Sequence, residues 1–342
     1  TLLQVIKLKK ILIILAVLAV TIISAGCSKK PVSQTAFLLD TVSTITIYDY
    51  SGDESADDII NECFSLCTEY EKKLSRTINT SEISVINSAK GNKVEVSDQT
   101  ADLIKKAIKY SELSNGKFDI TVAPVTSLWD FKSDSPAPPS DSNIKEALSH
   151  VSYKNISVEG NTVQLLDENA AIDLGGIAKG YIGDKAKEFL IEKGVKKALI
   201  NLGGNILVIC HENDSLIIGI QDPNAQEGTL SGAISTNGNS LVTSGIYQRC
   251  FEYNGKLYHH ILDTSTGYPV DNNLVSVTII GPESADCDAL STTVFCLGAE
   301  EGLKLINSLD GYEAVIITKD NKTLFSDGIN KTVEYRPASE LN

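Results

Sequence analysis

The feature that most constrains the fold is a succession of short strand-like segments in the second half of the chain. They are rich in apolar and β-branched residues and cover residues 156–158, 163–166, 197–201, 206–210, 217–221, 232–236 and 275–280. Short loops separate many of them, and short loops join antiparallel strands, whereas parallel strands need long crossover connections. The sequence therefore predicts a mixed α+β fold with largely antiparallel sheets and flanking helices.

Several amphipathic segments supply the flanking helices. Apolar residues recur at helical spacing over 57–74 and 100–113, and further helices are expected at 143–149, 176–193, 288–295 and 299–307. Residues 35–50 alternate in polarity and are rich in β-branched side chains, which predicts a strand. The run SDSPAPPSDS at 133–142 predicts a surface loop because proline and serine interrupt regular structure.

The charge of the chain excludes one large class of function. The 342 residues include 44 acidic and 30 basic side chains, a formal net charge of −14. Nucleic-acid binding depends on clustered cations, and no segment beyond the N-terminus provides such a cluster. We therefore expect no nucleic-acid partner. An apolar share of 42% suffices to bury a core and excludes a disordered chain.

The N-terminal residues have the organisation of a lipoprotein signal peptide. Lysines precede an apolar run over 11–23, which is shorter than the roughly 20 residues needed to cross a bilayer. The following Ser24-Ala25-Gly26-Cys27 resembles a bacterial lipobox, although Ser24 stands where leucine is usual. We expect cleavage of the signal peptide over 1–26, lipidation of Cys27, a tether over 27–36, and a domain over 37–335 anchored at the extracytoplasmic face of the cell membrane.

Six further cysteines follow Cys27. None of their spacings is a CxxC pair, and no cysteine–histidine quartet suggests zinc. Cys63 and Cys67 are four residues apart in a predicted helix, where their side chains can touch without reaching relaxed disulfide geometry. We therefore expect buried free thiols at Cys63, Cys67, Cys210, Cys250, Cys287 and Cys296.

The segment DLGGIAKG at 173–180 carries the sharpest chemical signal. Its glycine pair lets the backbone approach a ligand closely where a helix begins, and the helix dipole and Lys179 favour a phosphate there. The spacing matches neither a Walker A nor a GxGxxG motif, so an ordinary kinase or Rossmann dinucleotide site is not indicated. A tight strand-to-helix turn that uses glycine for steric reasons alone explains the segment equally well.

The segment DALSTT at 288–293 places a carboxylate and a hydroxyl on one helix face, because Asp288 and Thr292 are four residues apart. Hard oxygen ligands suit Mg²⁺, which commonly takes one or two protein carboxylates together with substrate phosphates. An aspartate before a first turn that contains serine and threonine is also a normal helix N-cap. Taken alone, the segment favours the cap.

The polar run over 241–269 holds two of the four histidines of the chain. In a strand, His259 and His260 face opposite sides, so only one of them can point into a site. A single histidine is more often structural, and the tyrosine and phenylalanine content is also typical of a plain hairpin. Two histidines within one glycine-bounded polar segment nevertheless favour a functional role.

These segments, with others in the same order, resemble the ApbE family. The resemblance covers residues 37–318 and rests on SEIS (81–84), GKFDITVAPVTSLWDF (116–131), DLGGIAKGY (173–181), NLGGN (201–205), TSGIYQR (243–249), HHILDTSTGYP (259–269) and DALSTTVFCLG (288–298). Each motif alone is weak, whereas the ordered set is specific. The resemblance implies an ApbE-like, T-fold-like architecture. It also implies a Mg²⁺-dependent FAD:protein FMN transferase, which moves FMN from FAD to a threonine hydroxyl of an acceptor protein and releases AMP.

The functional positions of the family carry over to this sequence residue by residue. The resemblance implies FAD contacts at Leu39, Lys117, Phe118, Asp119, Asp173, Lys179 and Leu262, and Mg²⁺ ligands at Gly176 through its carbonyl and at Asp288, Ser291 and Thr292. Three positions depart from the pattern: Ser291 stands where some members have aspartate, Leu39 where many have methionine, and Thr77 where some have tyrosine near the flavin. The first departure removes a carboxylate, and the third removes an aromatic neighbour of the flavin.

His260 is the candidate general base, because it matches the histidine of the family's H-[IVL]-[IL]-D run and because a threonine hydroxyl is a weak nucleophile near pH 7. The expected acceptor is a membrane-bound or extracellular flavoprotein subunit. Two other functions use the same residues: a Mg²⁺-dependent FAD pyrophosphatase that releases FMN and AMP, and an FAD-binding lipoprotein without catalysis. The latter is disfavoured, since holding FAD does not require His260 beside a Mg²⁺ site.

Overall fold

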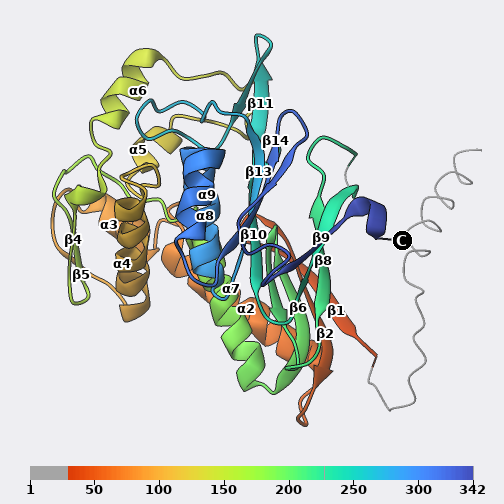
Figure 1. Ribbon diagram of the computed structural model, residues 1–342. Coiled ribbons are helices and arrows are strands. Elements are labelled where there is room, and N and C mark those ends of the chain that lie inside the picture. Colours follow the sequence, from red (N-terminus) through yellow and green to blue (C-terminus); the bar gives the residue numbers. More distant parts are fainter. Residues whose placement is uncertain (1–29, 227, 342) are drawn as a thin grey trace, which may run out of the picture. The chain divides into compact units, whose positions relative to one another are not determined.

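The computed structural model describes residues 30–226 and 228–341 and divides the chain into two units, Thr1–Lys30 and Pro31–Asn342 (Figure 1). The helices and strands that it describes all belong to the second unit. The predicted signal peptide over 1–26 and the predicted lipidation site, Cys27, lie outside the described residues. Among the residues that are described, no helix is both long and apolar enough to cross a bilayer.

An eight-stranded sheet forms the centre of the second unit. Its strand order is β1-β2-β6-β7-β10-β13-β14-β15, and every neighbouring pair is antiparallel. The strands are β1 (Val32–Leu38), β2 (Thr41–Tyr50), β6 (Val195–Leu202), β7 (Asn205–Ile209), β10 (Ser240–Gly245), β13 (Leu274–Gly281), β14 (Glu313–Thr318) and β15 (Thr323–Phe325). The predicted α+β class with antiparallel sheets is confirmed.

Both faces of the large sheet are buried, because side chains alternate along each strand. In β7, Leu207 and Ile209 join the main core, whereas Val208 joins a second core on the opposite face. Helices α2 (Ala56–Leu74), α7 (Ala178–Glu192) and α8 (Ser284–Leu297) cover the first face (Figure 1). The second face is covered by a three-stranded sheet of β8 (Leu216–Gln221), β9 (Leu230–Thr236) and β16 (Glu334–Pro337).

Smaller elements surround this centre. The segment between β2 and α7 contributes α3 (Glu82–Ser88), α4 (Asp98–Leu113), α5 (Ala123–Thr126), α6 (Asp141–Leu148) and a small sheet of β3 (Val94–Glu95), β5 (Thr162–Leu165) and β4 (Ile156–Glu159). A separate hairpin of β11 (Cys250–Tyr253) and β12 (Lys256–His259) packs its Phe251 and Tyr258 against Trp129, and α9 (Ala299–Asn307) follows α8. The predicted helices at 57–74, 100–113, 143–149 and 299–307 are confirmed to within two residues.

The expected single strand over 35–50 is wrong, because the chain reverses at Leu39 and Asp40. Both residues have positive φ, +56° and +59°, and β1 pairs with β2 in register from Leu38↔Thr41. Two-residue hairpin turns of this kind favour glycine, asparagine and aspartate. Asp40 is such a residue but Leu39 is not, and a single aspartate does not mark a turn within a segment that otherwise reads as a strand.

Strands extend beyond both ends of the expected domain over 37–335. Strand β1 begins at Val32, inside the segment expected as a tether, and β16 continues to Pro337 through pairing with β9. The predicted surface loop over 133–142 contains no helix or strand until α6 begins at Asp141. All six described cysteines are free, as expected, but only three are fully buried: Cys63, Cys67 and Cys287.

Candidate functional site

The glycine segment and the DALSTT segment meet where α7 packs against α8. Close approach of the two helices requires Gly180, because a Cβ there would collide with the Ser284 carbonyl oxygen. The Gly180 backbone N–H then donates to Asp288 Oδ2 over 2.8 Å. The Asp288 carboxylate of α8 is thereby hydrogen-bonded to the first turn of α7. This contact brings together two motifs that are more than a hundred residues apart in the sequence.

The N-cap interpretation of Asp288 is wrong. Helix α8 begins at Ser284, so Asp288 lies in its second turn, where its side chain is buried. The cap comes instead from α7: Asp184 accepts hydrogen bonds from the backbone N–H groups of Ser284 (2.7 Å) and Ala285 (2.8 Å). Asp288 is therefore free of the capping role that its local sequence favoured.

The charge on Asp288 is balanced by few neighbours. Burial raises the pKa of its carboxyl, while the Lys179 ammonium, the Gly180 N–H and the Asn205 side chain lower it. Burial in turn lowers the pKa of Lys179, whose Nζ donates to the Gly203 carbonyl (3.3 Å) and is attracted by Asp288. A buried carboxylate and the ammonium of a half-buried lysine thus lie in one another's field, a combination typical of functional sites.

Three hydroxyl groups continue the site along α8 and β10. Ser244 Oγ lies 2.8 Å from Ser291 Oγ and 3.4 Å from Thr292 Oγ1. The Ser291 hydroxyl also donates to the Asp288 carbonyl over 2.9 Å. Ser291 is fully buried and already engaged, whereas Thr292 is only half-buried.

The turn before α7 completes this cluster with Gly176. A Cβ at Gly176 would lie 2.9 Å from Phe118 Cε2 and 3.6 Å from Thr292 Oγ1, so any larger residue would displace the Phe118 ring. The structure therefore brings together all four predicted metal-site residues: Gly176, Asp288, Ser291 and Thr292. The donors that they offer, a carboxylate, hydroxyls and a backbone carbonyl, are hard oxygens and fit Mg²⁺. In the described part of the chain, no three His, Cys, Asp or Glu side chains form a metal-binding group of their own.

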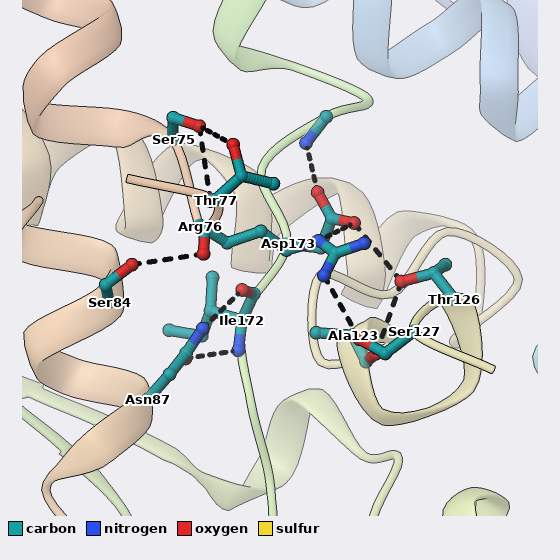
Figure 2. A network of polar contacts seen from close by, with 11 residues as sticks. Ser75, Arg76, Thr77, Ser84, Asn87, Ala123, Thr126, Ser127, Ile172 and Asp173 are labelled. Atoms are coloured by element: carbon teal, nitrogen blue, oxygen red, sulfur yellow. Dashed lines mark hydrogen bonds and ion pairs between the residues drawn. The ribbon is translucent and has the colours of Figure 1, made fainter. Parts of the chain in front are cut away.

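Asp173 lies on the other side of the glycine turn and is held by protein groups. Arg76 Nε donates to its Oδ2 over 2.7 Å, and the Gly175 backbone N–H donates to Oδ1 over 2.8 Å (Figure 2). The Thr126 hydroxyl adds a longer bond of 3.3 Å to Oδ2. The predicted FAD contact Asp173 is thus the centre of a polar network that joins three segments of the chain.

The predicted FAD contacts of the 116–131 motif differ in their surroundings. Lys117 Nζ pairs with Asp263 Oδ1 at 3.2 Å, and Phe118 is buried beneath Gly176. Asp119 is buried and accepts from the Thr121 N–H (2.8 Å), the Thr121 hydroxyl (2.6 Å) and the Tyr153 N–H (2.8 Å). Burial raises the pKa of the Asp119 carboxyl, and these bonds lower it. Its observed contacts stabilise the loops themselves.

The two adjacent histidines have different surroundings. His259 ends β12 as a buried side chain that lies edge-on to Phe295 and donates from Nε2 to the Val270 carbonyl (3.2 Å). Burial lowers its pKa to about 4. His260 is half-buried and donates from Nδ1 to the Arg249 carbonyl (3.3 Å), which leaves Nε2 as the proton acceptor. Burial, and then the charge of Arg249, lower the pKa of His260 to about 4.

Two predicted FAD contacts lie at the margins of this arrangement. Leu39 occupies the tip of the β1–β2 hairpin, and the neighbouring Asp40 binds Arg249 Nη2 (3.0 Å) and Lys132 Nζ (2.6 Å). Leu262 is buried in the aromatic cluster around Trp129 and Phe251. The hairpin tip therefore reaches the segment that carries His260, whereas the Leu262 side chain belongs to a core.

Sequence reasoning missed several residues that shape the site. Ser244 and Arg249 lie in the polar run over 241–269, where the sequence alone assigns them no role. Arg76 and Asp184 carried no local signal, because their partners lie far away in the sequence. Only the fold reveals such pairs.

Comparison with known proteins agrees with this geometry. Residues 39–316 match the ApbE family. An FAD:protein FMN transferase of Klebsiella pneumoniae (strain 342) is 36% identical over 83% of this chain and 89% of its own length. The one of Treponema pallidum (strain Nichols) is 30% identical over 87% of each chain. The crystal structure of the ApbE protein from Thermotoga maritima matches with a TM-score of 0.80 and 31% identity, over 87% of this chain and 97% of that one. The chain therefore belongs to the ApbE family.

Proposed function

We propose that the protein is a Mg²⁺-dependent FAD:protein FMN transferase that moves FMN from FAD to a threonine hydroxyl of an acceptor protein. Its similarity to transferases of that name supports the reaction class. The observation that carries the proposal is the position of Lys179, whose charge acts on both Asp288 and His260. The same cation therefore acts on a proposed metal ligand and on the proposed base.

The FAD pyrophosphate needs positive charge around it in an acidic protein. Lys179 and the first turn of α7 supply part of that charge. Asp288 and Thr292, with the Gly176 carbonyl, would hold Mg²⁺, which neutralises phosphate charge when bound. Because its hydroxyl already bonds to protein groups, Ser291 would support the ligands beside it and contribute less to the metal directly.

The chemical step transfers the FMN phosphoryl group from AMP to the threonine oxygen. The threonine oxygen attacks the FMN phosphorus, the P–O bond to AMP breaks, and AMP departs with the bonding electron pair. The hydroxyl proton passes to Nε2 of His260, whose Nδ1 is oriented by the Arg249 carbonyl. The lowered pKa keeps this imidazole neutral at pH 7, the state that can accept a proton.

The reaction can be tested with a soluble fragment, residues 28–342. It is incubated with FAD, Mg²⁺ and a candidate acceptor, and the products are separated. We expect a flavin-fluorescent acceptor band, AMP in equal amount, and loss of both after EDTA treatment. Free FMN and AMP without labelled acceptor would identify a pyrophosphatase instead. Bound but unchanged FAD would leave only a flavin-binding lipoprotein.

We further propose that the domain is tethered to the membrane through lipidated Cys27, on the extracytoplasmic side, where it would meet a membrane-bound or extracellular flavoprotein subunit. The support is the lipobox-like Ser24-Ala25-Gly26-Cys27 sequence. Full-length protein should partition with membranes, and the Cys27→Ala variant should not carry lipid. A mature N-terminus elsewhere with a free Cys27 thiol would refute the anchor.

A further inference from the structure

Arg76 lies in the short segment between α2 and α3, far in sequence from the glycine turn. Its guanidinium nevertheless donates from Nε to Asp173 Oδ2 (2.7 Å) and from Nη1 to Ser127 Oγ (3.1 Å) (Figure 2). The two side chains of the ion pair are only 28% and 21% exposed. A partly buried pair of this kind is screened less by solvent than a surface pair, and a planar guanidinium fixes its partner more strictly than an ammonium.

The backbone on both sides of this ion pair is also held. The Ser84 hydroxyl of α3 donates to the Arg76 carbonyl (3.1 Å). One turn further along the same helix, the Asn87 amide donates to the Ile172 carbonyl (2.9 Å) and accepts from the Ile172 N–H (2.7 Å). Helix α3 therefore anchors two adjacent positions, Ile172 through Asn87 and Asp173 through Arg76, as Figure 2 shows.

Asp173 transmits this anchoring to the glycine turn. Its Oδ1 accepts from the Gly175 N–H (2.8 Å), and a Cβ at Gly175 would lie 3.0 Å from the same oxygen. The turn is thus folded around the carboxylate. The residue that follows is Gly176, which packs closely against Phe118 and lies near Thr292, so a change in the shape of the turn would move it relative to both.

We propose that Arg76 is a positioning residue for FAD, which fixes the Asp173 carboxylate and the glycine turn and offsets the negative charge of Asp173 beside the pyrophosphate. The inference rests on the proposed function, since it assumes that FAD occupies this turn. Loss of the guanidinium should weaken FAD binding in two ways. Asp173 becomes free to reorient, and an uncompensated carboxylate repels the phosphates of the ligand.

The test is FAD binding, measured by flavin fluorescence in the presence of Mg²⁺ and without acceptor. Arg76→Gln should weaken FAD binding about tenfold or more, the scale of one lost hydrogen bond between charged groups. Arg76→Lys, which keeps the charge but not the planar fork, should recover part of the affinity. The matched control is Arg336→Gln, which breaks an Nε–carboxylate pair of 2.8 Å with Glu334 on β16. It should leave FAD binding unchanged.

A double-mutant cycle separates positioning from general destabilisation. If Arg76 acts through Asp173, Arg76→Gln should cost much less FAD affinity in an Asp173→Asn background than in the wild type. Equal losses in both backgrounds, or wild-type affinity of Arg76→Gln, would overturn the inference. The two proposals fail separately. A wild-type protein that neither binds FAD nor transfers FMN refutes the proposed function, whereas normal transfer together with normal FAD affinity in Arg76→Gln refutes only the role of Arg76.

Discussion

The two sides of the candidate site are built in different ways. On the α8 side, Asp288 and Ser291 are buried in the main core region and bonded to neighbouring helices and strands. On the other side, His260 follows a two-stranded hairpin that is separate from the large sheet, and Arg249 beside it is 50% exposed. The residues proposed to hold the metal, on the α8 side, therefore also stabilise the fold. The proposed base, His260, lies at the periphery. Substitutions on the α8 side should therefore change both the stability of the protein and the rate of transfer. A substitution of His260 should change mainly the rate of transfer.

The largest effect is expected at Asp288. Asp288→Ala removes the proposed metal carboxylate, so transfer should fall to the background rate at saturating FAD and millimolar Mg²⁺. The Gly180 N–H also loses its acceptor, which should lower the melting temperature. Asp286→Asn, on the same helix, is the control: it weakens bonds to Lys106 and Tyr312 and should cost stability while transfer per folded molecule persists. Full activity of Asp288→Ala would refute the metal assignment.

At the peripheral His260, a substitution should slow the transfer and leave the fold unchanged. His260→Asn should reduce transfer by about 10² or more while FAD affinity stays near the wild-type value, the usual scale for a positioned general base. FAD titration and single-turnover transfer measure the two effects separately. Equal losses of affinity and rate would make His260 a flavin contact.

The neighbouring histidine provides the opposite case. His259→Asn removes a buried ring that packs on Phe295, so it should lower the free energy of unfolding by about 1–3 kcal/mol and leave transfer by the folded protein nearly intact. Its low pKa adds an acid dependence: the folded state resists protonation, so stability from this group falls as the pH drops from about 6.5 toward about 4. A transfer loss larger than that of His260→Asn would reverse the two roles.

A smaller effect is expected at the hydroxyl groups. Thr292→Val keeps the volume and removes one oxygen donor, so the Mg²⁺ concentration for half-maximal transfer should rise by about tenfold. Ser291→Ala should raise it less, because that hydroxyl is already bonded to the Asp288 carbonyl and to Ser244. A normal Mg²⁺ titration of Thr292→Val would return Thr292 to a packing role.

The smallest expected change is a shift in the pH profile. An unperturbed histidine base would make transfer rise through pH 6.5, but burial and Arg249 lower the pKa of His260 to about 4. Transfer limited by this base should therefore stay level from pH 7 to pH 5 and fall only near pH 4. Arg249→Gln removes one cause, so the acid limb should move upward in pH. An unchanged limb would show that another group titrates.

The fold and the site differ in how far the sequence predicts them. Strand alternation and helical spacing are local properties, and they identified β6, β7, β8, β9, β13 and helix α2 to within two residues, but they did not identify β10 in the middle of the large sheet. The hairpin turn at Leu39 and Asp40 was not predicted because leucine rarely adopts positive φ and a single aspartate is a weak turn signal. The start of α8 escaped because its cap is supplied by Asp184 of another helix. Local patterns cannot reveal a cap that depends on tertiary contact.

The same limit applies to the site. The resemblance to the family indicated Gly176, Asp288 and Thr292, and their convergence follows from the packing of α7 on α8. It did not indicate Arg76, whose pairing with Asp173 spans 97 positions of the chain. Nor could residue types alone distinguish His259 from His260. That distinction depends on which side chain the end of β12 turns into the core.

The most direct test of the central claim is to locate the metal. Crystals of the 28–342 fragment with FAD and Mn²⁺ in place of Mg²⁺ would give an anomalous signal at the bound ion. We expect a peak where α7 meets α8, within about 2.0–2.3 Å of an Asp288 carboxylate oxygen and the Thr292 hydroxyl, and next to the FAD pyrophosphate. A peak elsewhere, or FAD bound with its pyrophosphate away from Gly176 and Lys179, would contradict this expectation.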